Sequence, residues 1–149
     1  MSAATAPGAS RPPTPSGGAD ARAVPRVSVV MPMHDAERHV GIAVRSILEQ
    51  TFADFELLVV DDGSTDGSTA VVEGFDDPRI RIVRQPRNLG VVAALNRGLE
   101  LARGTYVARM DADDVARPER FARQVARIDA DPALAVLGTN VEYVDADGE

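Results

Sequence analysis

Two aspartate-rich segments have the residue types and spacing of a ligand- or metal-binding site. They read DDGSTD at residues 61–66 and DADD at residues 111–114, and each follows an apolar stretch. Carboxylates that meet in one crevice raise one another's pKa unless a cation lies among them. Mg²⁺ or Mn²⁺ relieves this repulsion and also takes oxygens from phosphate groups. The pattern therefore indicates a nucleotide diphosphate held through a divalent metal ion.

The carboxylates of these runs can divide the work of binding such a ligand. Asp111 and Asp113 stand two residues apart, so that one can hold the metal while the other accepts hydrogen bonds from a ribose diol. Asp62 can accept a hydrogen bond from an N–H of the base. Taken alone, the run at 61–66 is more typical of a turn followed by capping residues, and Asn88 is equally well explained as a helix cap. A site is indicated only if the fold brings these residues together.

Short apolar strands alternate with amphipathic helices along the chain. Continuous β-branched runs predict strands, and apolar residues at three- and four-residue spacing predict helices. The alternation is typical of a parallel sheet covered by helices on both faces. The expected strands cover residues 27–31 (ended by Pro32), 55–60, 80–83, 106–110 and 134–144, the last in a hairpin with its turn at 145–148; the expected helices follow Asp35, cover 68–73 and 91–102, and begin at Pro118.

The polar segments fall at one edge of this expected sheet. Right-handed crossovers place the carboxyl ends of parallel strands along a single edge, and ligands of open α/β sheets bind there. Four polar segments come after expected strands: residues 32–35 (PMHD), 61–66, 87–90 (RNLG) and 111–114. In contrast, Asp76-Asp77 precedes a strand and is interpreted as a turn at the other edge. This convergence indicates a binding site.

The composition excludes several other functions. The net charge is −7 and all 16 basic residues are arginines, which disfavours nucleic acid as a partner. The chain has no Cys, which excludes disulfides and thiolate zinc sites and favours the cytoplasm. Its apolar runs are far shorter than the ~20 residues of a membrane span. Any membrane association is expected to come from a partner or from a missing C-terminal region.

The proline distribution divides the chain into a tail and a domain. Residues 1–25 hold five of the ten prolines, three glycines and many small residues. Such a segment buries too little apolar surface to offset the entropy of ordering it. We expect a disordered, dispensable tail at 1–25 and a single domain at 26–149.

Five runs occur together in an order and spacing that are specific to a known family. They read VSVVMPM at 27–33, SILEQTF at 46–52, DFELLVVDDGSTD at 54–66, RNLG at 87–90 and MDADD at 110–114. Over residues 26–149 they resemble the N-terminal half of a family 2 glycosyltransferase. The resemblance implies a GT-A fold, which is a Rossmann-like, mostly parallel sheet with helices on both faces, here truncated before the acceptor half. It also implies an inverting, metal-dependent enzyme that moves a glycosyl group from a nucleotide-sugar, often a UDP-sugar, to a saccharide or to a lipid- or protein-linked acceptor, as in polysaccharide biosynthesis.

By position, the resemblance assigns candidate residues to the base of the nucleotide. Pro32, His34 and Asp62 would surround the base, and Asn88 would border the same pocket. The family usually has an aromatic residue followed by Asn where this chain has His34 and Asp35. The His34 ring can still stack on a base, and Asp35 is included among the substrate-binding residues.

The same resemblance places the diphosphate and its metal, Mn²⁺ or Mg²⁺, at the DADD run. Asp111 would face the ribose and diphosphate and be the second carboxylate near the metal, and Asp113 would hold the metal. The family's catalytic base lies on the acceptor half, so it is expected beyond Glu149 and no catalytic residue is assigned here. The chain is therefore expected to bind the donor without useful turnover, because loss of a general base costs about 10²–10⁴-fold in rate.

Two other interpretations stay open. Residues 111–115 (DADDV) also match the nucleophile motif of haloacid-dehalogenase-type phosphotransferases, although that motif normally follows the first strand and here three strand–helix units precede it. A nucleotide-sugar-binding half-domain without catalysis is the other. Titration with UDP-sugars and Mn²⁺ separates these classes, because a phosphotransferase at Asp111 and Asp113 would ignore UDP and form an aspartyl-phosphate instead.

Overall fold

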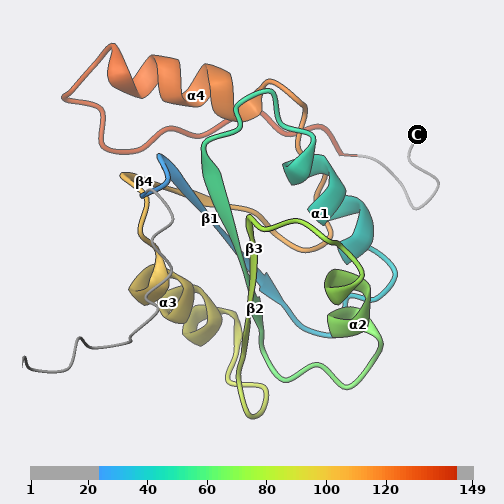
Figure 1. Cartoon of the computed structure of the whole chain (residues 1–149). Helices are drawn as coiled ribbons and strands as arrows, with labels where there is room; N and C mark the ends of the chain where they lie inside the picture. Colours follow the sequence, from blue (N-terminus) through green and yellow to red (C-terminus); the bar gives the residue numbers. More distant parts are fainter. Residues whose placement is uncertain (1–23, 144–149) are drawn as a thin grey trace, which may run out of the picture.

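A four-stranded parallel sheet forms the centre of the protein. The computed structural model describes residues 24–143 (Figure 1), and the strands lie in the order β3-β2-β1-β4. Strands and helices alternate along the chain, which confirms the α/β prediction. The elements are β1 (Val27–Met33), α1 (Val40–Leu48), β2 (Phe55–Asp61), α2 (Ser68–Glu73), β3 (Ile80–Arg84), α3 (Val91–Leu101), β4 (Tyr106–Arg109) and α4 (Arg120–Asp129).

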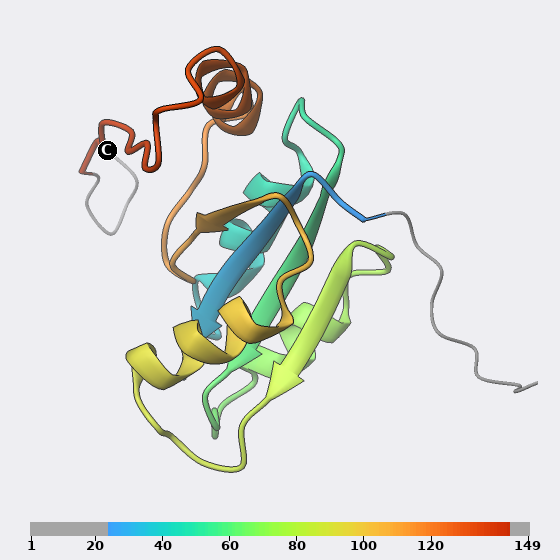
Figure 2. The same cartoon turned by 90° about the vertical axis from the view of Figure 1, so that its left-hand side faces the viewer.

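Helices cover both faces of the sheet, as expected. Alternate side chains of the two central strands point to opposite faces, and all of β2 is buried. On one face, Val29 and Leu57 belong to a core that includes residues of α1 and α2 and Phe121 of α4. On the other face, Val30 and Leu58 pack with Ala94 of α3. Figure 2 shows α3 on the near side of the sheet and α1 and α2 behind it.

Strand β1 runs two residues further than its sequence predicts, because Pro32 does not end it. The Val30 carbonyl accepts a hydrogen bond from the Met110 backbone N–H at 3.1 Å, so Val30 faces β4. Pro32, two residues on, faces the same side at a level where β4 has already ended. Its missing N–H therefore removes no bond from the ladder. The extension carries Pro32 and Met33 to the edge where the polar loops begin.

The strand predicted over residues 134–144 is absent from the part of it that the structure describes. Residues 134–143 form neither strand nor helix, and Val136, Val141 and Tyr143 are exposed. An apolar alternation becomes a strand only where a neighbouring strand supplies hydrogen bonds and burial. Within residues 24–143, β4 is paired with β1 alone and no strand lies beyond it. The turn predicted at 145–148 and nearly all of the predicted tail lie outside the described residues.

Helix α3 lies against the sheet at a glycine, which gives a test of the packing. A Cβ on Gly98 would lie 2.2 Å from Cγ1 of Val30, whereas a Cβ on Gly138 would meet nothing within 4 Å. Gly98→Ala should lower the free energy of unfolding by about 1–3 kcal/mol, because helix and strand must separate. Gly138→Ala is the control and should change it by less than about 0.5 kcal/mol. Urea denaturation of both variants measures this, and equal midpoints would show that α3 is not packed closely on β1.

Candidate nucleotide-binding site

The loops that follow β1, β2, β3 and β4 surround one cavity of about 460 Å³ at the carboxyl edge of the sheet. This volume lies within the usual range of small-molecule sites. All seven residues that the sequence nominates line this cavity, although their roles in binding stay predictions. They are Pro32, His34, Asp35, Asp62, Asn88, Asp111 and Asp113.

Asp35 ties the loop after β1 to the loop after β2. Its backbone is left-handed, with φ of 46°, which Asp tolerates better than most residues. Its N–H donates to the Ser64 hydroxyl at 3.2 Å, and its carboxylate accepts from the Thr65 N–H at 2.7 Å. The Asp35 carboxylate is therefore engaged by the protein itself. The Nε2 atom of His34, which also lines the cavity, lies 3.5 Å from this carboxylate.

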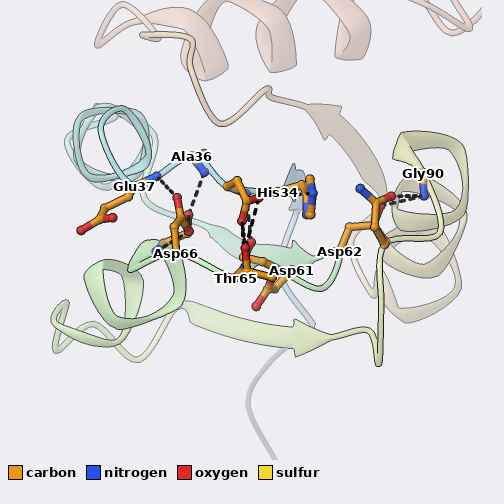
Figure 3. Close-up of polar contacts among 12 residues, drawn as sticks. His34, Ala36, Glu37, Asp61, Asp62, Thr65, Asp66 and Gly90 are labelled. Carbon is orange, nitrogen blue, oxygen red and sulfur yellow. Dashed lines mark hydrogen bonds and ion pairs between the residues drawn. The ribbon is translucent and has the colours of Figure 1, made fainter.

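Further contacts along the same two loops make this junction continuous. The Ala36 N–H donates to the Ser68 hydroxyl at 2.7 Å, and the Glu37 N–H donates to the Asp66 carboxylate at 3.1 Å. Figure 3 shows both contacts between the start of α1 and the start of α2. The Ser68 hydroxyl, the largest influence on Asp66, lowers the pKa of that carboxyl. Asp66 therefore stabilises the loops around the cavity and is not a ligand candidate.

Asp62 is the most deeply placed carboxylate of the site, with 3% of the residue exposed. Its Oδ1 accepts from the Leu89 N–H at 2.8 Å and from the Gln85 amide at 2.7 Å, and its Oδ2 accepts from the Gly90 N–H at 2.8 Å. A carboxylate has about four acceptor positions, so one stays open on Oδ2. Asp62 thus holds the loop after β3 in place and retains a single acceptor for a ligand N–H.

Asn88 lies on that loop beside a close approach of two backbones. A Cβ on Gly63 would lie 2.5 Å from the carbonyl carbon of Arg87, and the φ of Gly63 is 71°, so only glycine suits this position. The Asn88 side chain accepts from the Gly90 N–H at 3.0 Å. Gly90 itself is the N-cap of α3, with no side-chain cap bond. The expectation that Asn88 caps this helix is therefore wrong, because its contact stabilises the turn that precedes the helix.

Asp111 and Asp113 line the cavity from the loop after β4, and a cation stands beside them. Arg109 Nε and Nη2 donate to the two Asp111 oxygens at 3.1 Å and 3.0 Å. The pKa of the next carboxyl, Asp114, is raised, mainly by burial and further by the negative charges of Asp111 and Asp113. The carboxylates of this loop therefore repel one another at Asp114, while Arg109 offsets the negative charge of Asp111.

Sequence reasoning missed two polar residues that line the cavity, Arg109 and His39. Arg109 stands at the end of an apolar strand, directly before the DADD loop, and a charge at that position is the signal that was available. His39 directly precedes the first residue of α1. It is exposed, but the turn after Asp35 brings it to the cavity.

The side chains present suit a metal that is only partly coordinated by protein. Within residues 24–143, no three His, Asp or Glu side chains gather closely enough to enclose a metal ion. Asp111 and Asp113 supply hard carboxylate oxygens on one wall of the cavity. Mg²⁺ is typically bound by one or two carboxylates with substrate phosphates and water completing its shell. The chemistry and number of these two carboxylates fit this pattern, and metal binding by Asp111 and Asp113 stays a prediction.

A second cavity, of about 640 Å³, lies at the opposite edge of the sheet and is larger. Two of its arginines are already paired, Arg79 with Asp77 at 2.7 Å and Arg103 with Glu56 at 2.8 Å. None of the seven nominated residues lines it. The turn predicted at Asp76-Asp77 lies near this edge, where Asp77 holds Arg79. The charged groups of this second cavity are thus mainly paired with one another. The smaller cavity at the carboxyl edge is the better candidate for the ligand site.

A parallel α/β sheet with a carboxylate-lined cavity at its carboxyl edge defines the class of open α/β domains that bind ligands at that edge. The model of the family "Glycosyl transferase family 2" matches residues 28–149, and the chain belongs to this family of enzymes. Among the helices of residues 24–143, none has the length and apolar character to cross a membrane.

Several relatives carry related names. The chain is 35% identical over 127 residues to the putative glycosyltransferase EpsE of Bacillus subtilis (strain 168), covering 83% of this chain and 46% of that protein. It is 37% identical over 125 residues to the succinoglycan biosynthesis protein ExoO of Rhizobium meliloti (strain 1021), covering 84% and 36%. The chain therefore spans less than half the length of these relatives.

Solved structures agree with the fold. S. aureus TarS 1–349 in complex with UDP superposes with a TM-score of 0.67 at 29% identity, over 70% of this chain and 32% of that one. The mannosyltransferase PcManGT from Pyrobaculum calidifontis, in complex with GDP-Man and Mn²⁺, gives 0.65 at 30% identity, over 72% and 33%. The expectation of a GT-A fold is confirmed, and the matched part is about a third of each structure.

Proposed function

We propose that this chain binds the nucleotide-sugar donor of an inverting, metal-dependent glycosyltransferase, with a UDP-sugar as the donor. The observation that carries the proposal is the convergence of Asp62, Asp111 and Asp113 from two separate loops on one cavity. The names of relatives and neighbours support it, since one neighbour holds UDP and another holds GDP-Man and Mn²⁺. We propose a saccharide or a lipid- or protein-linked acceptor, in glycan synthesis on the cytoplasmic side.

The base of the nucleotide would lie between the loops after β1 and β3. The His34 imidazole offers a flat face for stacking and Pro32 an apolar surface, and Asn88 lines the same cavity. The open acceptor position on Asp62 Oδ2 suits a base that carries a ring N–H, as uracil does. Because backbone N–H groups already orient Asp62, little ordering is needed when the base binds.

The ribose and diphosphate would lie along the DADD loop. Asp111 accepts hydrogen bonds from the ribose diol and contributes to the metal site, and Asp113 holds the metal. When bound, Mn²⁺ or Mg²⁺ would neutralise the charge that develops on the leaving diphosphate. Arg109 adds a second positive charge beside Asp111. Asp111 and Asp113 bind and orient the donor, and no residue of this chain is assigned as the base that activates the acceptor.

Calorimetric titration of the 149-residue chain tests the proposal. UDP should bind in the presence of Mn²⁺ at least about tenfold more tightly than after removal of Mn²⁺ with a chelator, which corresponds to about 1.4 kcal/mol. Uridine should bind weakly and respond little to the metal. GDP in place of UDP examines the choice of base.

Three results would change the assignment. A preference for GDP would replace the uracil proposal and keep the donor site. Absence of binding by both diphosphates would overturn the function. Formation of an aspartyl-phosphate at Asp111 from a phosphate ester with Mg²⁺, without UDP binding, would favour the phosphotransferase class.

A further inference from the structure

Arg109 is the charged residue of the cavity for which the proposed function has no defined contact. It is the last residue of β4, and its side chain is 60% exposed beside the cavity. Its Nε and Nη2 are used by Asp111. Among the hydrogen bonds of residues 24–143, none involves its Nη1. Nη1 is therefore a donor group that an incoming anion can contact first.

The bond between Arg109 and Asp111 is of a kind that exchanges easily. Both side chains are exposed by 40% or more, and ion pairs at such sites contribute little to folding stability. The forked geometry by which a guanidinium binds a carboxylate is also the geometry by which it binds a phosphate. A diphosphate in this cavity would hence offer Arg109 an equivalent partner. Asp111 would then be released for the metal and the ribose.

The backbone at Arg109 is anchored, which keeps this guanidinium near the cavity. Arg120 Nη2 donates to the Arg109 carbonyl at 2.9 Å, and Arg120 Nη1 contacts the Met110 sulfur at 3.2 Å. The Arg120 side chain is half-buried, and its hydrogen bond fixes the backbone at the end of β4. A charged side chain on a fixed strand end is positioned more closely than one on a free loop.

We propose that Arg109 is a ligand of the donor's diphosphate and that its bond to Asp111 is the arrangement of the site before the donor binds. This inference rests on the proposed function and adds a specific anion-binding residue to it. Nucleoside diphosphates would gain from Arg109, whereas nucleosides would not. The metal and Arg109 would share the charge of the two phosphates.

The test compares UDP with uridine on two variants of Arg109. Arg109→Gln should weaken UDP binding in Mn²⁺ by about 10- to 100-fold, the effect of losing a hydrogen bond to a charged group. Uridine affinity should stay within about twofold, because the nucleoside carries no phosphate. Arg109→Lys keeps the charge without the fork and should recover part of the loss. If GDP proves to be the tighter ligand, GDP and guanosine take the place of UDP and uridine.

Arg127→Gln is the matched control. Arg127 donates to Asp131 at 3.1 Å, is 54% exposed, and lies on α4 outside the cavity lining. This change removes the same charge from a similar ion pair and should leave UDP affinity unaltered. An equal loss in both variants would assign the effect to net charge alone and overturn the inference.

Other outcomes separate this inference from the function on which it rests. Tighter Mn²⁺-dependent UDP binding by Arg109→Gln would mean that Arg109 only competes with the metal for Asp111. Parallel losses for UDP and uridine would mean that it only supports the fold of the loop, and unchanged UDP affinity would mean that it makes no contact. Each of these overturns the inference while the donor site stands. Failure of the unaltered chain to bind UDP or GDP would overturn both.

Discussion

Asp113→Asn should remove the Mn²⁺ dependence of UDP binding. The amide replaces an anionic oxygen ligand by a neutral one, and hard divalent cations favour carboxylate oxygen. Asp113 is the proposed main protein ligand of the metal and Asp111 is paired with Arg109, so loss of the Asp113 carboxylate should leave the metal too weakly held. UDP affinity in Mn²⁺ should fall by roughly 100-fold, about 2.8 kcal/mol, to the value without metal. Calorimetric titration with and without Mn²⁺ measures both numbers.

Asp111→Asn provides the comparison, because it should fail differently. Its side chain keeps an acceptor for the ribose, so UDP binding should weaken but still respond to Mn²⁺. The change also releases Arg109 from its ion pair, which offsets part of the loss if Arg109 binds the diphosphate. If both variants bind UDP as the parent does, with metal dependence intact, the DADD loop is only a polar turn and the site assignment is wrong.

Neither substitution should unfold the protein. The charges of Asp111 and Asp113 contribute, after burial, to the raised pKa of Asp114, which is a sign of mutual repulsion. Removing one charge relieves this repulsion in the empty site. The thermal midpoint without ligand should therefore stay unchanged or rise slightly. A large fall would show that the carboxylate supports the loop, and the binding data for that variant would then report on folding.

Glu56→Gln should cause a large loss of stability without any direct contact with the ligand cavity. Glu56 is 4% exposed near the amino end of the central strand β2. It accepts from the Ser28 hydroxyl at 2.6 Å, from the Arg103 N–H at 3.0 Å, and from the Arg103 guanidinium at 3.0 Å and 2.8 Å. Replacing a buried charged acceptor leaves these donors poorly satisfied. The free energy of unfolding should fall by about 2–3 kcal/mol near neutral pH.

The effect of Glu56→Gln should also depend on pH. Burial alone would raise the pKa of Glu56, but the bonds from Ser28 and Arg103 outweigh it and hold the pKa below its usual value of 4.5. A lowered pKa in the folded state stabilises the protein fully above the unfolded pKa. That contribution is lost as the pH falls through the folded value. The difference between parent and variant should therefore shrink below pH 4.5.

Urea denaturation at several pH values measures this difference, with an exposed pair as the control. Glu100 pairs with Arg97 at 2.9 Å on the surface of α3, and Glu100→Gln should change stability by less than about 0.5 kcal/mol at any pH. A loss of similar size in the Glu56 and Glu100 variants would contradict the role of the buried network. A difference that stays constant from neutral to acidic pH would show that the charge of Glu56 is not what matters.

The sequence alone predicted the order of strands and helices and the edge at which the polar loops meet. The central strands are buried on both faces, so their apolar runs are continuous and can be recognised locally, as at 27–31 and 55–60. Parallel strands with right-handed crossovers then place their carboxyl ends together whatever the loops contain. For this reason all seven nominated residues surround one cavity in the structure. Two general rules of backbone geometry were enough to gather them.

Only the tertiary structure decided what each of those side chains contacts. The Asp35 carboxylate turns to Thr65, three of the acceptor positions of Asp62 are taken by the loop after β3, and Asp111 is paired with Arg109. The absent strand at 134–143 has the same cause, because an apolar alternation needs a neighbour that the local sequence does not specify. Hydrogen bonds and ion pairs form with whatever the fold brings within about 3 Å. Most of these partners lie twenty or more residues away along the chain, where no local pattern can identify them.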